Sequence, residues 1–556
     1  MFGLGVCGLL TALSALGTVP ARAEFSAVAV DPLEWLYPDS RVQAWTNAPF
    51  REVDVPLNGV AEAQFLFNGL DTSRPLAIGC DVPSGGEWFR LVDVPVEKNT
   101  DLIDFAAHNP EPNPYVTRKA PFRVYDALAP VPAGGVVFPN SATMALRFQL
   151  RELPVGRESF DIAFRFSQGG TVRAFSLRVN VSPVLLPSVG AKSFKYTNWT
   201  NLGKIARRHG LKPWSEAHFA MIAKYARLAA RGRQNMMPIE LGDVFDVAED
   251  KSVRLRKDRL ERLVDIYTGA GIYWLEGGHL ARFKDENWRA DHFELWLTRE
   301  RATAPEGVRT IASIARQLDA AIVRNGWKAR WVQHSADEPH PPNDRDYRIL
   351  AGIVRRHFPG YTIVDAVETP LLAGAVDIWC PKPTKFYANR AVFENARRQC
   401  GDRIWIYTCC DPGGKWLNRL LDGELIKPLF IPWACAVDGI EGYLHWGLNQ
   451  WSDSRDPFNY SCFGPAGDGT MVLPAGDTHI LYPGPEGPWS SARFEAMRQG
   501  MEDFEIIARA RARDAAQADT LVRTCVRAFN DWTADVPLYR RTRRALLDLA
   551  SGAARK

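Results

Sequence analysis

The stretch Trp331-Val-Gln-His-Ser-Ala-Asp-Glu-Pro339 decides how the centre of this chain is interpreted. It begins as an apolar run typical of a buried strand and ends in two adjacent carboxylates, Asp337 and Glu338, followed by proline. Neighbouring acids repel each other, so burial in one cleft is expected to leave one ionised and the other protonated near neutral pH. The pattern predicts proton-transfer chemistry at the end of a strand. A plainer interpretation is a polar turn before a helix that starts near Asn343.

Similar strand-like runs lie on either side of this one, and helical stretches separate most of them. The eight candidate strands span residues 194–199, 235–241, 272–276, 329–334, 361–366, 377–381, 403–409 and 439–446. Helical patterns cover 213–231, 309–324, 344–357 and 392–400, whereas the connection 368–376 is too short for a full helix. Eight strand–helix units in succession predict a (β/α)8 barrel of the TIM type.

The sequence on both sides of the expected barrel has a different texture. Residues 24–188 alternate short Val-, Phe- and Leu-rich runs with Pro, Gly and Asn breaks, which predicts an antiparallel β-sandwich domain. The barrel is expected over 189–490, and residues 491–556 predict a helical C-terminal extension. The expected fold class is therefore α/β, with a barrel between a β-sandwich and a helical extension.

The first 23 residues have the features of an export signal. An apolar segment, 9–19, runs into Ala21-Arg-Ala23, which fits the small-x-small pattern of a signal-peptidase site. No Lys or Arg precedes the apolar segment, so a miscalled start or a poorer signal stays open. No other segment approaches the roughly 20 apolar residues of a membrane span. We expect a signal peptide over 1–23, an exported protein in the periplasm or outside the cell, and no membrane span.

The charge balance and the spacing of cysteines and histidines bear on which partners and metals the chain is expected to bind. The 68 Lys and Arg nearly balance the 64 Asp and Glu, without a long single-sign block, which argues against nucleic acid. The cysteines that follow the expected signal peptide are irregularly spaced without a Cys-x-x-Cys pair, which argues against a zinc ribbon but is compatible with one or two disulfides. His279 and His334 lack metal-ligand spacing. No metal and no cofactor are predicted, and no feature indicates an oligomeric state.

Polar and aromatic residues follow many of the expected strands. Active sites of such barrels lie at the carboxyl ends of the strands, so these residues are expected to form one rim. Besides Asp337 and Glu338, the candidate substrate-binding residues are Asn198, Trp199, Glu276, His279, His334, Asp365, Tyr407, His445, Trp446, Asn449 and Trp451. Aromatic faces beside carboxylates and amides suit a ring-shaped ligand with many hydroxyls. The expected partner is a carbohydrate.

Several short motifs carry a resemblance to a known family. They include His334-Ser-Ala-Asp-Glu-Pro339 and Gly442-Tyr-Leu-His-Trp-Gly-Leu-Asn449. Further motifs lie at 193–199, 214–218, 232–235, 377–381, 405–409, 467–469, 482–484 and 500–503. In this order they resemble the β-N-acetylgalactosaminidases of glycoside hydrolase family 123 and the related domain family DUF4091. The resemblance covers roughly residues 193–507.

The resemblance implies a retaining, substrate-assisted glycosidase for terminal β-linked N-acetylhexosamine, with N-acetylgalactosamine favoured. In such enzymes the substrate's own 2-acetamido oxygen attacks the anomeric carbon, an accepted exception to double displacement through a protein nucleophile. Asp337 matches the residue that orients the acetamide, and Glu338 matches the general acid and base. A hydrogen bond from Tyr407 to the acetamido oxygen is a further hypothesis.

Two alternatives stay open. The first is a glycosidase for another linkage that uses a protein nucleophile, for which Asp365 and Glu368 are the reserve carboxylates. The second is a noncatalytic carbohydrate-binding protein. Asp468, in a Gly-rich loop, is an additional candidate for the rim, although Gly-Asp-Gly is usually only a turn.

Overall fold

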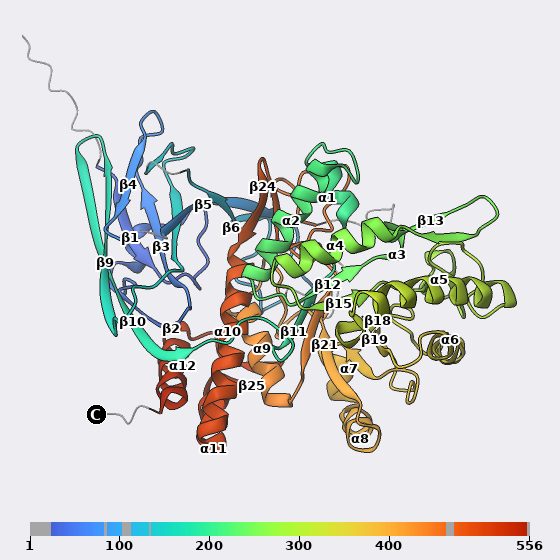
Figure 1. Cartoon of the computed structure of the whole chain (residues 1–556). Coiled ribbons are helices and arrows are strands. Elements are labelled where there is room, and N and C mark those ends of the chain that lie inside the picture. Colours follow the sequence, from blue (N-terminus) through green and yellow to red (C-terminus); the bar gives the residue numbers. More distant parts are fainter. Residues whose placement is uncertain (1–23, 83–85, 103–112, 133–134, 463–471, 553–556) are drawn as a thin grey trace, which may run out of the picture.

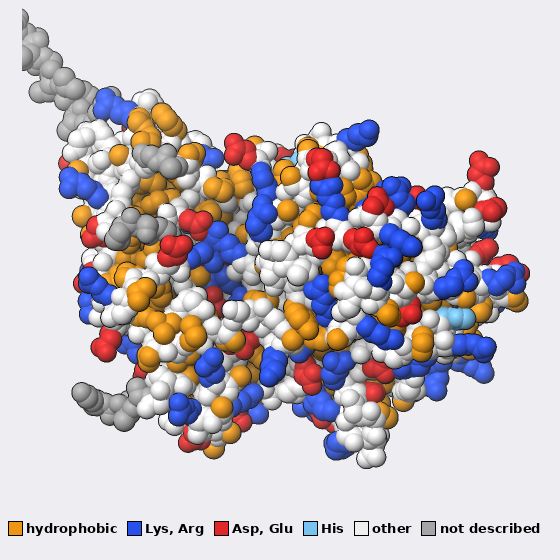
Figure 2. Space-filling model, in the orientation of Figure 1, with side chains coloured by type: hydrophobic (Ala, Val, Ile, Leu, Met, Phe, Trp, Pro, Cys, Tyr) orange, Lys and Arg blue, Asp and Glu red, His pale blue; other side chains and the backbone are white. Residues whose placement is uncertain are grey.

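The computed structural model of the chain describes residues 24–82, 86–102, 113–132, 135–462 and 472–552. A β-rich N-terminal domain, drawn in blue and teal, lies beside a helix-covered barrel, and the red C-terminal helices run between the two (Figure 1). Acidic and basic side chains are interspersed over most of the face in Figure 2. The predicted signal peptide lies outside the described residues.

Eight parallel strands close into the predicted barrel. In order around the barrel they are β11 (Lys195–Asn198), β12 (Met236–Ile239), β15 (Trp274–Gly277), β18 (Trp331–Gln333), β19 (Thr362–Val367), β20 (Ile378–Pro381), β21 (Arg403–Tyr407) and β22 (Gly442–His445). Strand β22 pairs with β11 and closes the circle. Each strand overlaps one of the eight runs expected from the sequence, which confirms the fold class.

The barrel interior is filled by side chains rather than by solvent. Met236, Val332, Val364, Ile378 and Trp405 belong to one buried apolar cluster inside the strands. A Cβ atom on Gly442 would lie 2.6 Å from the Trp405 ring, so only glycine fits at that point of β22. The packed interior leaves the open end at the strand carboxyl termini as the place for a ligand.

Helices surround the barrel as the sequence pattern predicts. They are α1 (Leu202–Arg208), α2 (Glu216–Arg231), α3 (Leu241–Val244), α4 (Lys257–Gly269), α5 (Pro305–Arg324), α6 (Asp344–His357), α7 (Pro383–Ala388), α8 (Arg390–Cys400) and α9 (Ile426–Asp438). No helix lies between β19 and β20, in agreement with the short connection there. Two small hairpins, β13 (Phe245–Val247) with β14 (Val253–Leu255) and β16 (Ala281–Phe283) with β17 (Phe293–Leu295), extend the loops after β12 and β15.

The N-terminal domain consists of two sheets packed face to face on an aromatic core. One sheet contains β1 (Ser26–Val30), β3 (Ala61–Asn68), β5 (Gly86–Val96), β6 (Phe122–Pro130) and β8 (Met144–Leu150). The other contains β2 (Glu52–Leu57), β4 (Leu76–Cys80), β7 (Val136–Val137), β9 (Ser159–Gln168) and β10 (Thr171–Leu185). Phe65 meets Phe164 and Phe166 from the facing sheet at ring-centroid distances of 4.9 and 4.8 Å. One pair departs from the predicted antiparallel pattern, because β2 runs parallel to β10.

The C-terminal part of the chain returns to the N-terminal domain. The hairpin β23 (Tyr482–Gly484) and β24 (Gly487–Ser491) extends the seven-stranded sheet, because β24 pairs with β6. Helices α10 (Ala492–Arg513), α11 (Ala515–Cys525) and α12 (Val536–Ser551) follow. A short hairpin, β25 (Val526–Ala528) with β26 (Asp531–Trp532), interrupts the otherwise helical extension that the sequence predicted.

A buried ion network joins α10 to this sheet. Arg498 of α10 contacts Glu495 and Glu502 of its own helix at 2.7 Å each, and Glu62 of β3 at 2.9 Å. Arg147 of β8 also pairs with Glu62, at 2.7 Å. Because buried charges need close partners, this network fixes the position of α10 against the domain.

Two further properties concern the described part of the chain. All eight of its cysteines are free thiols. None of its helices combines the length and apolar character that crossing a membrane requires.

Candidate active site

A cavity of about 240 Å³ opens at the carboxyl ends of the barrel strands. Its lining consists of Trp199, Asp337, Glu338, Ala366, Tyr407, Cys409, Cys410, Leu444, Trp446, Leu473 and Asp477. Trp199, Asp337 and Trp446 follow β11, β18 and β22, and Tyr407 is the last residue of β21. The volume is small beside the roughly 300–1,000 Å³ of pockets for drug-sized ligands, and it suits a single sugar ring.

The two acids share the cavity because the backbone turns sharply between them. In an extended strand successive side chains point to opposite faces. Glu338 has φ 46°, in the left-handed region, which breaks that alternation and lets both carboxyl groups line one cavity. Such a conformation costs about 1–3 kcal/mol in a non-glycine residue and is concentrated at functional sites. Helix α6 begins only at Asp344, so the pair is not part of its N-terminal cap.

The Glu338 carboxyl group is held by a phenol that it shares with a second carboxylate. The Tyr407 hydroxyl lies 2.5 Å from Glu338 Oε1 and 2.7 Å from Glu368 Oε1. Burial raises the pKa of Glu338, against the opposing charge of Lys382. Burial also acts to raise the pKa of Glu368, but the charge of Lys382 and its hydrogen bond outweigh it and lower that pKa. Tyr407, expected to bind the acetamide, is thus hydrogen-bonded to two carboxyl groups of the protein.

Lys382 connects the acids at this edge of the cavity. Its Nζ lies 2.9 Å from Glu368 Oε1, 2.8 Å from Asp411 Oδ1 and 3.8 Å from Glu338 Oε1. Burial would lower the pKa of Lys382, but the surrounding anionic groups outweigh it and raise that pKa. The residue was missed in the sequence although a signal existed: Lys382 directly follows β20, where the strand-end rule applies.

Asp337 presents an unused acceptor to the cavity. Its Oδ1 atom is buried without a hydrogen-bond partner, whereas the side chain as a whole is 41% exposed. Burial and the neighbouring Glu338 charge raise the pKa of Asp337 well above its ordinary value. His279 Nε2 lies 4.0 Å from this oxygen and also lacks a partner. Burial lowers the pKa of His279 well below its ordinary value, so its ring is neutral.

A buried layer beneath the cavity orients Trp199. His334 bridges Glu276 Oε1 at 2.7 Å and Asp365 Oδ1 at 2.8 Å. Burial would lower the pKa of His334, but the hydrogen bonds that its ring donates to these two carboxylates outweigh burial and raise that pKa to about 10. Glu276 also accepts a 2.8 Å hydrogen bond from Trp199 Nε1. Three predicted contacts, Glu276, His334 and Asp365, therefore support the wall of the cavity and do not line it.

Asp477 forms the opposite side of the cavity. Its Oδ1 accepts a 3.0 Å hydrogen bond from Trp446 Nε1, and its Oδ2 is buried without a partner. Burial raises the pKa of Asp477 to about 7. This residue was also missed in the sequence. It lies far along the loop between β22 and β23, so it does not directly follow a barrel strand.

Four predicted rim residues are buried and do not line the cavity. Asn198 bonds Gln234 Oε1 at 2.8 Å, and His445 Nδ1 accepts a 2.6 Å hydrogen bond from Arg419. Asn449 holds the backbone of Asn201 by bonds of 2.8 and 3.0 Å. Trp451 donates to the Leu481 carbonyl at 2.9 Å and is fully buried. Each of these side chains hydrogen-bonds a neighbouring side chain or loop, and no pattern in the sequence separates that use from contact with a ligand. Asp468 lies outside the described residues.

Two groups of side chains among the described residues place metal-ligand atoms close together: His279, His334 and Asp365, and Cys409, Cys410 and Asp411. In the first group, both ring nitrogens of His334 are hydrogen-bonded to carboxylates. In the second, Asp411 Oδ1 is paired with the Lys382 ammonium at 2.8 Å. These contacts already use the ring nitrogens of His334 in the first group and the carboxylate oxygen of Asp411 in the second.

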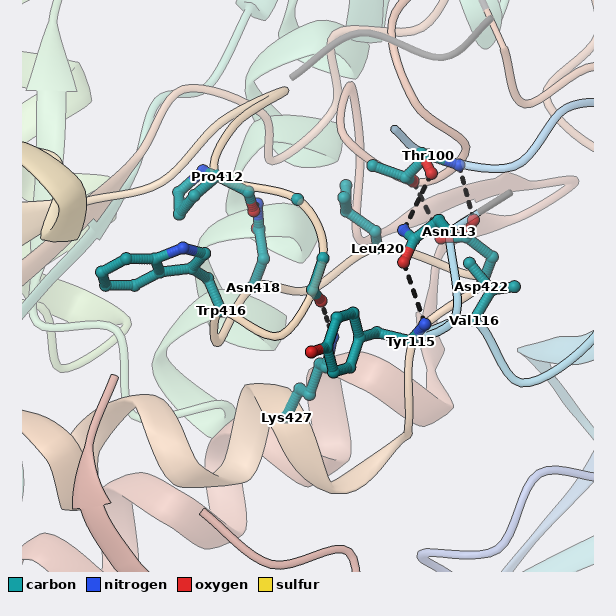
Figure 3. Close-up of a pocket in the computed structure, with 13 residues that line it drawn as sticks. Thr100, Asn113, Tyr115, Val116, Pro412, Trp416, Asn418, Leu420, Asp422 and Lys427 are labelled. Atoms are coloured by element: carbon teal, nitrogen blue, oxygen red, sulfur yellow. Dashed lines mark hydrogen bonds between the residues drawn. The ribbon is translucent and has the colours of Figure 1, made fainter. Parts of the chain in front are cut away.

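A second pocket lies behind the loop that follows β21, where the N-terminal domain meets the barrel (Figure 3). Its free space is about 10 Å³, room for one water molecule at most. Asp422 accepts bonds from the Thr100 backbone N–H at 2.6 Å and from its hydroxyl at 2.8 Å. Lys427 Nζ donates to the Gly414 carbonyl at 2.7 Å. This pocket is a packed seam that anchors the loop carrying Cys409 and Asp411.

Comparisons with known proteins concern the family and the fold. Residues 257–510 match the family profile for the glycoside hydrolase 123 catalytic domain. No curated protein matches the chain. A solved structure of a family 123 glycoside hydrolase from Clostridium perfringens, whose analysis concerns glycolipid glycan hydrolysis, aligns with a TM-score of 0.67 at 9% identity. The alignment covers 95% of this chain and 97% of that one, and it establishes the shared fold.

Other solved glycosidases align less well. A β-glucuronidase from Parabacteroides merdae has a TM-score of 0.33 at 9% identity, covering 80% of this chain and 51% of that one. An endo-β-1,4-mannanase from Thermotoga petrophila has a TM-score of 0.32 at 12% identity, covering 57% of this chain and 77% of that one.

Proposed function

Since the chain belongs to glycoside hydrolase family 123 and is a glycosidase, we propose that it removes terminal β-linked N-acetylhexosamine, preferably N-acetylgalactosamine, with retention of configuration. The observation that carries the proposal is the pair Asp337 and Glu338, held on one cavity of single-ring size by the left-handed turn at Glu338. An acid and a hydrogen-bond acceptor on adjacent residues match what substrate assistance requires.

In the first step the acetamido oxygen of the substrate attacks the anomeric carbon. Glu338 gives its proton to the glycosidic oxygen as that carbon–oxygen bond breaks, and the leaving alcohol departs. The acetamide N–H donates to Asp337 Oδ1, the buried oxygen that has no hydrogen-bond partner within the protein. A nucleophile within the substrate removes much of the entropic barrier, and a positioned acid contributes about 10²- to 10⁴-fold in rate.

In the second step Glu338, now a carboxylate, takes a proton from water. The water oxygen bonds to the anomeric carbon, the bond to the acetamido oxygen breaks, and the N-acetyl group is restored. Glu338 ends the cycle protonated, as it began. Because each of the two substitutions inverts the anomeric carbon, its configuration is retained overall.

The charge of Asp337 is expected to change on binding. Burial and the charge of Glu338 raise the pKa of Asp337. The acetamide N–H and the oxazolinium cation that forms beside it both favour the ionised carboxylate, so Asp337, whose side chain is 41% exposed, gives its proton to solvent when the substrate binds. The carboxylate is then a preorganised counter-charge for the intermediate, which is the form of stabilisation that contributes most in many enzymes.

The remaining walls suit the other faces of the sugar. Trp199 and Trp446 offer indole surfaces for the apolar face of the ring, and Glu276 and Asp477 fix their orientation through the indole N–H groups. The free Oδ2 of Asp477 is an acceptor for one ring hydroxyl. A buried acceptor that needs a hydroxyl partner rejects sugars that lack it.

Three parts of this proposal concern the setting of the enzyme. The signal-like residues 1–23 support export to the periplasm or the outside of the cell. The small cavity supports action at the chain end. The Clostridium enzyme's connection with glycolipid glycans makes such glycans the first natural substrates to test.

The test is a panel of aryl β-glycosides that differ only at C2 and C4. We expect turnover of both 2-acetamido sugars, faster with the galacto configuration, and at least about 10³-fold slower turnover of 2-hydroxy sugars, because the internal nucleophile is lost. Comparable rates on 2-hydroxy sugars would overturn substrate assistance in favour of a protein nucleophile such as Glu368 or Asp365. No turnover of any member would favour the noncatalytic alternative.

A further inference from the structure

A single phenol hydroxyl lies between two carboxyl groups in the active site. The Tyr407 oxygen is 2.5 Å from Glu338 Oε1 and 2.7 Å from Glu368 Oε1. A phenol has one proton, so it donates to only one of these oxygens. The other contact is a hydrogen bond only if that carboxyl group carries a proton and donates it to the phenol oxygen. The arrangement therefore holds one extra proton, on one carboxyl group or the other.

Two lysines decide which carboxyl group is ionised. Glu368 Oε1 lies 2.9 Å from Lys382 Nζ, and Glu368 Oε2 lies 3.2 Å from Lys385 Nζ. Glu338 has Lys382 only at 3.8 Å. Since both ammonium groups contact Glu368 more closely, Glu368 is the carboxylate and accepts the Tyr407 proton. Glu338 is then the protonated partner and donates to Tyr407.

We propose that Lys382 and Glu368 are positioning residues that decide, through Tyr407, which carboxyl group carries the extra proton. Lys382 holds Glu368 in the ionised form, and the charge of Glu368 keeps the proton on Glu338 in the resting enzyme. The inference rests on the proposed role of Glu338 as general acid. Neither positioning residue lines the cavity, so both act through Tyr407 and Glu338.

Glu338, Tyr407 and Glu368, here called the triad, also serve the second half of the cycle. When Glu338 has given its proton to the leaving group, two carboxylates face one phenol. The Tyr407 proton can then turn from Glu368 to the new Glu338 carboxylate, and Lys382, 3.8 Å away, offsets its charge. When Glu338 takes a proton from water, the phenol returns to Glu368. No proton enters or leaves these three side chains apart from the one that Glu338 gives to the leaving group and the one that it takes from water.

Several charged groups face this triad and belong to the balance. Asp411 accepts from Lys382 at 2.8 Å, and the Cys409 thiol donates to Asp411 at 3.0 Å. Asp337 is adjacent to Glu338, and the His334 imidazolium lies beneath it beside Asp365. Burial, Glu368 and Asp411 act to raise the pKa of Glu338, whereas the charge of Lys382 acts to lower it. Removing Glu368 and removing Lys382 should therefore shift the titration of Glu338 in opposite directions.

The test is the pH profile of kcat/KM for Glu368→Gln and Lys382→Met on a substrate with a poor leaving group. A general acid is lost as pH rises through its pKa. Without the Glu368 charge the Tyr407 proton turns to Glu338, which ionises more easily, so the alkaline limb moves to lower pH by about one unit or more. Without the Lys382 charge the limb moves to higher pH, and the rate below the limb falls because the proton is shared with Glu368.

Three controls separate this role from a structural one. A dinitrophenyl glycoside, whose leaving group needs no proton, should be cleaved by both variants with kcat/KM, which reports the first step, within about threefold of the parent enzyme. Lys385→Met, which removes a lysine that is 45% exposed, should shift the limb less than Lys382→Met. Thermal unfolding reports whether each variant is folded.

The inference is overturned if Glu368→Gln leaves the limb in place, if both variants move it in the same direction, or if good and poor leaving groups lose rate equally. Should Glu368→Gln fail to fold, the limb of Lys382→Met alone decides, because a shift to lower pH or no shift contradicts the inference. Glu338→Gln tests the underlying assignment separately. If that variant cleaves poor leaving groups normally, the general acid itself is misassigned.

Discussion

At the scale of single residues, the active site depends on one backbone conformation. The left-handed φ of 46° at Glu338 places two consecutive carboxyl groups on the same cavity. The adjacency of Asp337 and Glu338 was evident in the sequence, and so was their place after a strand. Their opposite neighbours, Lys382 and Asp477, were not among the expected site residues. Lys382 obeyed the strand-end rule that had found the other candidates, whereas Asp477 came from a loop that no local pattern distinguishes.

The roles of the two acids predict different losses of activity. Glu338→Gln should lower kcat/KM about 10²- to 10⁴-fold on poor leaving groups and much less on dinitrophenyl glycosides, because only the former need a proton. Asp337→Asn should lower it about 10²- to 10³-fold on every 2-acetamido substrate, because the counter-charge of the cation is lost. Steady-state kinetics with both leaving groups checks this. Full activity of both variants would refute the assignment.

Asp477 is predicted to select the sugar rather than to take part in proton transfer. Asp477→Asn keeps the size of the side chain but replaces a carboxylate acceptor, so KM should rise about tenfold, equivalent to the roughly 1–3 kcal/mol of a buried polar contact. The alkaline limb of the pH profile should stay in place. Deoxy substrates identify the hydroxyl that Asp477 contacts, because the deoxy sugar that lacks this hydroxyl should have the same KM with the parent enzyme and with the variant. Equal effects on all deoxy sugars would argue against a direct contact.

At the scale of elements, the parallel strands were predictable because each is buried on both faces and appears as a short apolar run. All eight runs correspond to barrel strands. The ends of these strands were harder to assign, because a polar residue there faces either the cavity or the supporting layer. Asn449 and Trp451 illustrate the difficulty, since both follow β22 and both bond to neighbouring loops. Only tertiary packing separates such residues from Trp446.

The layer under Trp199 predicts a dependence of stability on pH. His334 joins β15, β18 and β19 through Glu276 and Asp365. Its pKa is raised to about 10 in the folded state, above the ordinary value near 6.5. Its contribution is therefore complete below pH 6.5 and is lost as pH rises toward about 10. Thermal unfolding across pH 6–10 should show a loss that His334→Gln lacks. Parallel curves for the two proteins would contradict the prediction.

The loop after β21 should lose its support when the seam with the N-terminal domain is broken. Asp422→Ala leaves the Thr100 donors without their buried acceptor, at a cost of about 1–3 kcal/mol for each unsatisfied group. We expect a lower thermal midpoint and faster reaction of Cys409 and Cys410 with a thiol reagent. Asp453→Ala, which removes an exposed ion pair with Arg207, is the matched control. If the thiols react at the parent rate, the seam does not hold the loop.

At the scale of the whole molecule, the barrel and the N-terminal domain are joined by charge as well as by apolar packing. Arg498→Ala would leave Glu62, Glu495 and Glu502 without their shared cation, which should cost about 3–5 kcal/mol. Arg544→Ala, whose partners Glu52 and Asp54 lie nearer the surface, should cost about 0–1 kcal/mol. Denaturant unfolding of the two variants measures the difference. Equal losses would show that the network is no more stabilising than a surface pair.

The pairing of β24 with β6 has a consequence for how the polypeptide matures. One edge of β6 has no partner until β24 has been synthesised near the end of the chain. An unpaired strand edge favours association with other molecules. Fragments that end before residue 487 should therefore aggregate or bind chaperones. A barrel that begins at residue 189 should leave the hairpin of β23 and β24 without the sheet that it pairs with. In protein engineering, the N-terminal domain and the barrel should therefore be transferred together as one folding unit.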